Sequence, residues 1–199
     1  MIDEANRVDA DARRAASVRA RAVVIAGPPA SGKTTLGAAL ARALHHALID
    51  LDIVTGPLTS AALALAGADE TALDGELGAQ LRDARYGTLL DTAEANLRAG
   101  IGVVLTGPFT RERSDPASWE ALRARLGGAE TCLICLELDE RHRRARMRAR
   151  GAVRDQRKLT AALEPRPPQA RLPQGAIPLD AAVGRRMLLD SALAALSRC

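Results

Sequence analysis

Residues 22–35 read AVVIAGPPASGKTT and join an apolar run to a glycine-rich turn and the start of a helical pattern. The run at 22–26 is typical of a buried strand, and leucines at helical spacing follow over 36–44. Residues 27–34 match the P-loop pattern, in which two glycines with four residues between them precede Lys and Thr. The stretch therefore predicts a phosphate-binding strand, loop and helix.

The chemistry of this loop indicates a nucleotide triphosphate, which we take to be ATP. Backbone N–H groups of the loop and the helix N-terminus attract phosphate oxygens. Lys33 has the position that reaches the β and γ phosphates, and Thr34 has the hydroxyl that ligates Mg²⁺. The predicted nucleotide-binding residues are Gly27, Pro28, Pro29, Ala30, Ser31, Gly32, Lys33, Thr34 and Thr35.

Apolar runs alternate with helical patterns along the chain, which favours an α/β fold with a largely parallel sheet. Pro178 lacks the amide that a central strand uses, so its segment is predicted at the sheet edge. Between the strands we expect, among others, helices at about 79–99 and from 116. The five strand candidates are residues 22–26, 47–52, 101–109, 131–138 and 176–180.

Composition limits the classes of function. The 199 residues suffice for one domain at 21–199 behind a polar N-terminal arm at 1–20. No segment reaches the roughly 18 apolar residues of a membrane span, so a cytoplasmic protein is expected. The net charge of +4 is mild, and there is one Trp, one Tyr and one Phe. This composition argues against a nucleic-acid partner that is bound by base stacking.

Two of the three cysteines, Cys132 and Cys135, lie three apart in the strand-like run CLIC. Residues three apart on a strand point to opposite faces, which argues against a disulfide or a metal clip there. We expect both to be reduced, small apolar residues of a buried strand. The third cysteine is Cys199.

Asp50 and Asp52 lie two apart at the end of the second predicted strand, so both are expected to face the crevice at its carboxyl end. Asp50 is assigned to Mg²⁺ together with Thr34. Asp52, nearer the strand exit, is assigned as the base that accepts the proton of a substrate hydroxyl. The alternative is a pair of solvated carboxylates in a loop or helix cap.

Four segments together resemble the small AAA-type P-loop kinases of the adenylate-kinase-like group. These are VVIAGPPASGKTTLGAALARAL, ALIDLDIVTGPL, RDARYGTLLDTAEANLRAGIGVVLTGPF and RMRARGAVRDQRKL, over about residues 22–160. That group includes zeta toxins, chloramphenicol phosphotransferase and polynucleotide kinases, and the nearest members are bacterial ATP-binding proteins. The resemblance implies a three-layer sandwich around five parallel strands, with a small helical lid at about 141–160.

In such proteins, the second strand's acid, here Asp52, deprotonates the acceptor, and lid arginines, here Arg146 and Arg150, close over ATP. These two arginines are four apart and share one helix face. The sequence departs from the relatives at two positions. Thr106 stands where relatives carry an acid, which leaves metal binding to Asp50 and Thr34. Thr55 stands where polynucleotide kinases carry an arginine, which weakens a nucleic-acid acceptor.

The acceptor pocket is predicted between residues 53 and 86. Arg82 and Tyr86 lie four apart on the long helix, and similar pairs occur in the relatives. Two interpretations stay open: a substrate-binding pair, or Tyr86 in the core with Arg82 at the surface.

The predicted function is transfer of the γ-phosphoryl group of ATP, with Mg²⁺, to a hydroxyl of a small molecule. One alternative is a nucleic-acid or nucleotide-sugar kinase. Another is an ATP-binding switch or ATPase without an acceptor. The sequence identifies neither the acceptor nor the oligomeric state.

Overall fold

The computed structural model describes residues 21–127, 130–151 and 172–199. The N-terminal arm and the second half of the predicted lid lie outside these residues. The strands are Ala22–Ala26 (β1), Ala47–Asp50 (β2), Val103–Thr106 (β3), Thr131–Glu137 (β4) and Ile177–Asp180 (β5). The helices are Lys33–Leu44 (α2), Leu51–Leu65 (α3), Glu76–Arg98 (α4), Pro116–Arg125 (α5), Glu140–Arg150 (α6) and Arg185–Leu196 (α8), with a 3₁₀ helix at Glu70–Asp74 (η1).

The five strands form one parallel sheet in the order β2-β3-β1-β4-β5, which confirms the predicted α/β fold. All five residues of β1 are buried, as expected for a central strand that is covered on both faces. β5 lies at the edge, where Pro178 is tolerated. Within the described residues, every helix is too short or too polar to cross a membrane.

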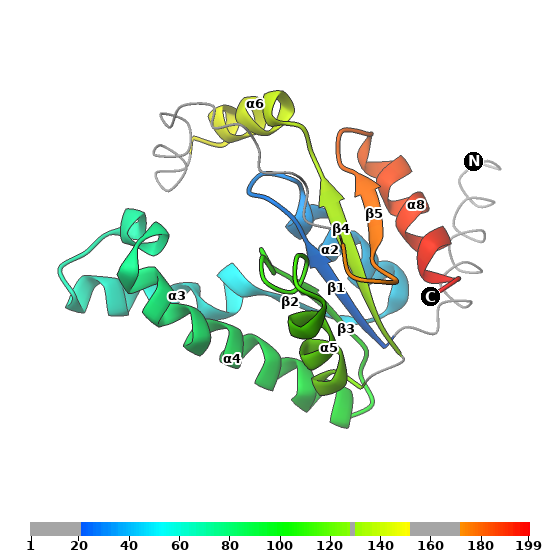
Figure 1. Cartoon of the computed structure of the whole chain (residues 1–199), viewed down its shortest axis with the longest axis horizontal. Coiled ribbons are helices and arrows are strands. Elements are labelled where there is room, and N and C mark those ends of the chain that lie inside the picture. Colours follow the sequence, from blue (N-terminus) through cyan, green and yellow to red (C-terminus); the bar gives the residue numbers. More distant parts are fainter. Residues whose placement is uncertain (1–20, 128–129, 152–171) are drawn as a thin grey trace.

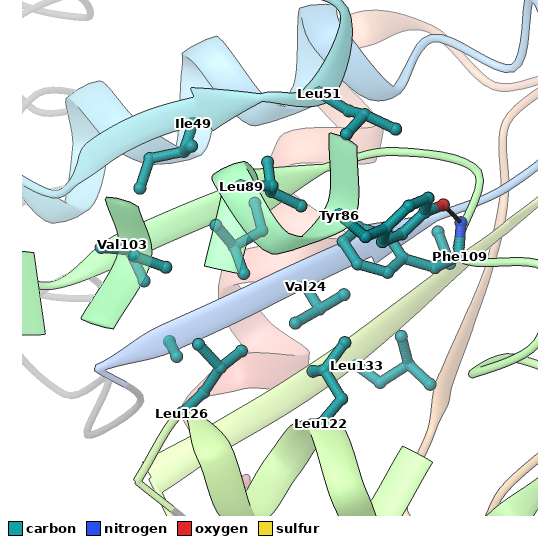
Figure 2. Packing of buried hydrophobic residues seen from close by; sticks show 14 of the residues in the cluster. Val24, Ile49, Leu51, Tyr86, Leu89, Val103, Phe109, Leu122, Leu126 and Leu133 are labelled. Atoms are coloured by element: carbon teal, nitrogen blue, oxygen red, sulfur yellow. Dashed lines mark hydrogen bonds between the residues drawn. The ribbon is translucent and has the colours of Figure 1, made fainter. Parts of the chain in front are cut away.

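Helices cover both faces of the sheet, so the architecture has the three predicted layers (Figure 1). Alternate residues of β1 divide between two cores: Val23 and Ile25 pack with α2 and α8. Val24 packs on the opposite face, against α4 and α5, where Leu89 and Leu122 lie close to it (Figure 2). Burying these apolar faces is the main favourable contribution to folding.

The second strand ends earlier than predicted, and this corrects the placement of Asp52. β2 ends at Asp50, and α3 begins at the next residue. The Asp50 carboxylate accepts hydrogen bonds from the backbone N–H groups of Asp52 and Ile53, which is an N-cap that starts a helix. Asp50 and Asp52 therefore do not share a strand face, and the helix-cap alternative describes Asp50 correctly.

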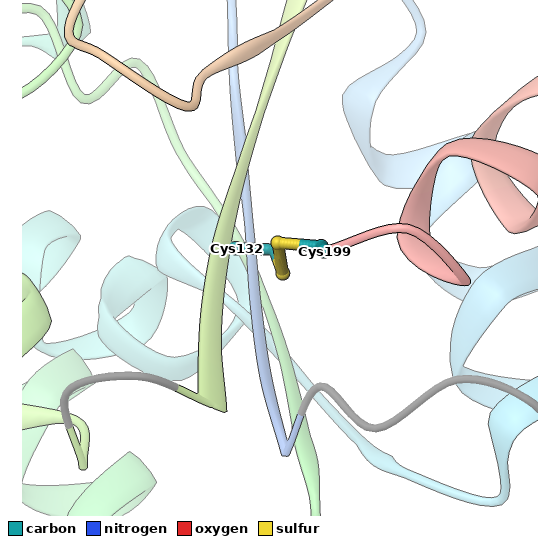
Figure 3. Close-up of a disulfide and its surroundings, with 2 residues drawn as sticks. All are labelled: Cys132 and Cys199. Carbon is teal, nitrogen blue, oxygen red and sulfur yellow. A yellow bond between two sulfur atoms is a disulfide. The ribbon is translucent and has the colours of Figure 1, made fainter.

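A disulfide joins Cys132 in β4 to Cys199, just after α8, with the Cα atoms 6.5 Å apart (Figure 3). The prediction of a reduced Cys132 is therefore wrong. Cys132 and Cys135 do belong to opposite cores, but α8 packs on the face that carries Cys132 and brings the C-terminus there. Cys135 is a free, buried thiol, and burial raises its pKa to about 11.

Breaking this disulfide should lower the free energy of unfolding. The bond closes a loop with a sequence separation of 67 residues. Its removal restores chain entropy to the unfolded state, worth about 4 kcal/mol in the loop-closure treatment. Urea unfolding with and without dithiothreitol measures the difference. Cys199→Ser is the control, since reductant should not change its stability, and equal midpoints for wild type in both conditions would contradict the prediction.

Candidate functional site

The loop between β1 and α2 presents backbone donors at the carboxyl edge of the sheet. Gly27, Ala30 and Gly32 all have positive φ, at 159°, 62° and 94°. A Cβ on Gly27 would lie 2.9 Å from Ser31 Oγ, so the tight turn requires glycine there. Gly32 supplies no side-chain cap to α2, which leaves the first N–H groups of this helix for an anion.

Lys33 folds back over this loop. Its Nζ donates to the carbonyl oxygens of Gly27 at 3.0 Å and Pro28 at 2.8 Å. Burial lowers the pKa of Lys33 to about 8, although the carboxylates of Asp52 and Asp50 oppose this effect. Within the described residues, the partly buried ammonium thus has only carbonyl groups at hydrogen-bond distance, and an incoming phosphate would offer it a stronger partner.

Asp50 gathers hydroxyl groups from two other elements at the edge of the sheet. Thr34 Oγ1 donates to Asp50 Oδ2 at 2.7 Å, and Thr106 Oγ1 donates to the same oxygen at 2.5 Å. Asp50 is 6% exposed. Thr106 occupies the position at which relatives carry an acid. Here its hydroxyl instead binds the carboxylate of Asp50, the last residue of β2.

This donor set fits Mg²⁺. The ion prefers oxygen ligands, and it is usually held by one or two carboxylates while phosphates and water complete its shell. Thr34 and Asp50, the two predicted ligands, already touch each other. Among the described residues there is no larger cluster of acidic, histidine or cysteine side chains that could hold a metal without a nucleotide.

Asp52 lies in the first turn of α3 and is half exposed, beside an arginine that the sequence reasoning missed. Arg85 of α4 donates from Nη2 to Asp52 Oδ1 at 2.9 Å and from Nε to Thr55 Oγ1 at 3.0 Å. The sequence pattern predicted Arg82, three residues earlier on the same helix, as the arginine of the acceptor pocket. Sequence spacing alone gave no sign of which arginine faces α3.

Arg146 reaches the phosphate loop from α6. Its Nη2 donates to the carbonyl of Ala181 at 2.7 Å, and its Nη1 approaches the carbonyl of Ser31 at 3.5 Å. Arg150, one turn further along the same helix, is exposed, and its charge contributes to the lowered pKa of Lys33 after burial. Arg146 therefore lies on the side of α6 toward the loop, which Figure 1 shows below that helix, and the lid role of Arg150 stays a prediction.

Tyr86 lies in the core rather than at an open surface. Its hydroxyl accepts a hydrogen bond from the backbone N–H of Phe109 at 2.9 Å, and the two rings meet edge to face at 5.4 Å (Figure 2). Arg82 lies over the Tyr86 ring, 4.5 Å from its centroid, and 3.8 Å from Glu112. The geometry favours the core interpretation of Tyr86, with a role in holding the loop after β3.

Tyr86→Phe should therefore lower stability and leave substrate recognition unchanged. The variant leaves the buried Phe109 N–H without a partner, which costs about 1–3 kcal/mol. Chemical unfolding measures this cost. If Tyr86→Phe instead kept full stability and raised the KM for the acceptor, the substrate interpretation would hold.

The sequence matches the family model described as an AAA domain over residues 23–164. That span begins inside β1 and includes the phosphate loop, Asp50, Asp52 and α6. A search of curated proteins found no match to this chain.

Solved structures of kinases share the fold. A gluconokinase from Sinorhizobium meliloti 1021 is 20% identical, with 89% of this chain and 91% of that chain covered and a TM-score of 0.55. A sugar kinase from Janibacter sp. HTCC2649 is 21% identical, with 89% and 94% covered and a TM-score of 0.56. Shikimate kinase from Aquifex aeolicus is 16% identical, with 89% and 96% covered and a TM-score of 0.52. These chains have the same arrangement of strands and helices.

Proposed function

We propose that this chain, which belongs to the AAA domain family, transfers the γ-phosphoryl group of ATP to a hydroxyl of a small molecule. One observation carries the proposal: Asp50 accepts a hydrogen bond from Thr34 of the phosphate loop, and it also caps α3, whose first turn presents the half-exposed carboxylate of Asp52. The phosphate loop suits a phosphate donor, and the accessible carboxylate of Asp52 suits a hydroxyl acceptor. The solved kinases named above support the same class of reaction.

The donor half consists of the loop, α2 and α6. Backbone N–H groups of residues 27–35 and the Lys33 ammonium would bind the phosphates, and Arg146 and Arg150 would close over them. Mg²⁺, when held by Thr34 and Asp50, would neutralise charge on the phosphates. Once closed over the phosphates, these cations would be in place before transfer begins, so little reorganisation would be needed as charge develops in the transition state.

The acceptor half begins at Asp52. Its carboxylate would accept the proton of the substrate hydroxyl while that oxygen bonds to the γ-phosphorus and ADP leaves. Beside it, Arg85 donates hydrogen bonds to both Asp52 and Thr55. Thr55 and the scarcity of aromatic residues argue against a nucleic-acid end. We also propose that the chain is related to the zeta toxins, chloramphenicol phosphotransferase and polynucleotide kinases.

A coupled assay of ADP release tests the proposed function. Purified protein should release ADP slowly alone and at least tenfold faster with a suitable acceptor from a panel of small hydroxyl compounds. A labelled oligonucleotide that accepts phosphate would replace the small-molecule assignment with a nucleic-acid kinase. Hydrolysis that no compound in the panel stimulates would favour an ATP-binding switch instead.

ATP affinity should fall as the pH rises above about 8, the pKa of Lys33 in the free protein. Below this pH the ammonium is charged and attracts the phosphates. Above it, binding must take up a proton, because bound phosphates raise the pKa, so affinity falls by up to about tenfold per pH unit. Titration calorimetry between pH 7 and 9 measures the slope. Lys33→Met should remove it, and an equal slope in that variant would contradict the assignment.

A further inference from the structure

Arg85 is the side chain near Asp52 that the proposed function does not use. We propose that Arg85 binds an anionic group of the acceptor, so that the substrate is a hydroxylated carboxylate or phosphate ester. This inference rests on the proposed function, since it takes Asp52 to face the acceptor.

The guanidinium of Arg85 is held in place independently of Asp52. Its Nε donates to Thr55 Oγ1, and the Thr55 hydroxyl in turn donates to the carbonyl of Leu51 at 2.5 Å. Thr55 is 3% exposed, so this anchor is buried within α3. Asp52 occupies only Nη2, and among the described residues Nη1 has no hydrogen-bond partner. An anion can therefore approach Nη1 and Nη2 without releasing the anchor.

The cations on this side outnumber the carboxylates available to them. Arg82 has Glu112 as its partner, and Arg85 has Asp52. In the part of the chain that the structure describes, Arg113 has no carboxylate within ion-pair distance. Arg113 directly follows Glu112, the partner of Arg82, so this loop carries a positive charge without a carboxylate partner.

The shape of the guanidinium also favours an anionic acceptor. A planar guanidinium matches the geometry of a carboxylate or phosphate through two parallel hydrogen bonds.

The competing explanation is that Arg85 only positions Asp52. The two roles differ in what Arg85→Gln changes. A positioning role predicts the same fall in kcat for every acceptor. A binding role predicts a fall in kcat/KM that is confined to acceptors with an anionic group.

The test measures ADP release with matched acceptors: D-gluconate against D-glucitol, and D-glycerate and glycerol 3-phosphate against glycerol. Wild type should have a higher kcat/KM for the anionic member of a pair. Comparing D-gluconate and D-glycerate with glycerol 3-phosphate then shows whether the preferred anion is a carboxylate or a phosphate. Arg85→Gln should reduce kcat/KM by about 100-fold for the anionic acceptor and only a few-fold for the neutral one. Arg98→Gln, which removes an exposed cation from the same helix, is the control and should resemble wild type.

A binding measurement separates failure of this inference from failure of the proposed function. With the donor site filled by a non-hydrolysable ATP analogue and Mg²⁺, D-gluconate and inorganic phosphate are titrated calorimetrically. Anion binding should weaken at least tenfold in Arg85→Gln and stay unchanged in Arg98→Gln. Equal losses on neutral and anionic acceptors, a preference for neutral acceptors, or anion binding unaffected by Arg85→Gln would each overturn the inference. Absence of any stimulated ADP release would count against the proposed function instead.

Discussion

Asp52→Asn is expected to reduce the rate of phosphoryl transfer by about 10²–10⁴-fold, the usual contribution of a general base. Asparagine keeps the size of the side chain and can still accept a hydrogen bond from Arg85, but its amide cannot take the proton of the acceptor hydroxyl. The measurement is steady-state ADP formation at saturating ATP and acceptor.

Donor binding should survive this substitution, because Asp52 pairs with Arg85 of α4, which lies outside the proposed donor half. The dissociation constant for ATP with Mg²⁺ should stay within about threefold of wild type, a small change for a side chain outside the donor site. Asp83→Asn, at an exposed position of α4, is the matched control for loss of one carboxylate and should keep full activity. Full activity in Asp52→Asn would remove the base assignment, and lost ATP binding would place Asp52 in the donor half.

The fold was predictable where the information is local. The strand, loop and helix at 22–44 follow from a contiguous motif with apolar flanks, and the structure confirms their order and type. α5 begins at Pro116, as predicted, and the Asp115 side chain caps it. The parallel sheet followed from the alternation of strand and helix patterns.

The site was less predictable, because its contacts join distant segments. Arg85 meets Asp52 across 33 residues, and Cys132 meets Cys199 across 67. Periodicity assigns each residue to a face but does not say which other element will cover that face. The end of β2 was misjudged for another reason: Asp52 continues an alternating pattern, while the capping bonds of Asp50 decide the boundary.

Lys33→Met is the second substitution with a large expected effect, and it should separate function from stability. Without the ammonium, the donor phosphates lose a preplaced cation, and kcat should fall by about 10²–10³-fold, as for other preorganised electrostatic groups. Lys33→Arg should not restore the rate, because a planar guanidinium does not reproduce a compact ammonium.

Lys33→Met should not lower the free energy of unfolding, although it lowers kcat. The pKa of Lys33 is lowered to about 8 from an ordinary value of 10.5, so at pH 7 the folded protein holds a charge that burial disfavours. That cost is present below pH 8 and disappears as the pH rises towards 10.5. Lys33→Met should therefore be at least as stable as wild type at pH 7 in urea unfolding, and the difference should shrink at pH 10. A destabilised, inactive variant would instead indicate that Lys33 holds the loop through the carbonyls of Gly27 and Pro28.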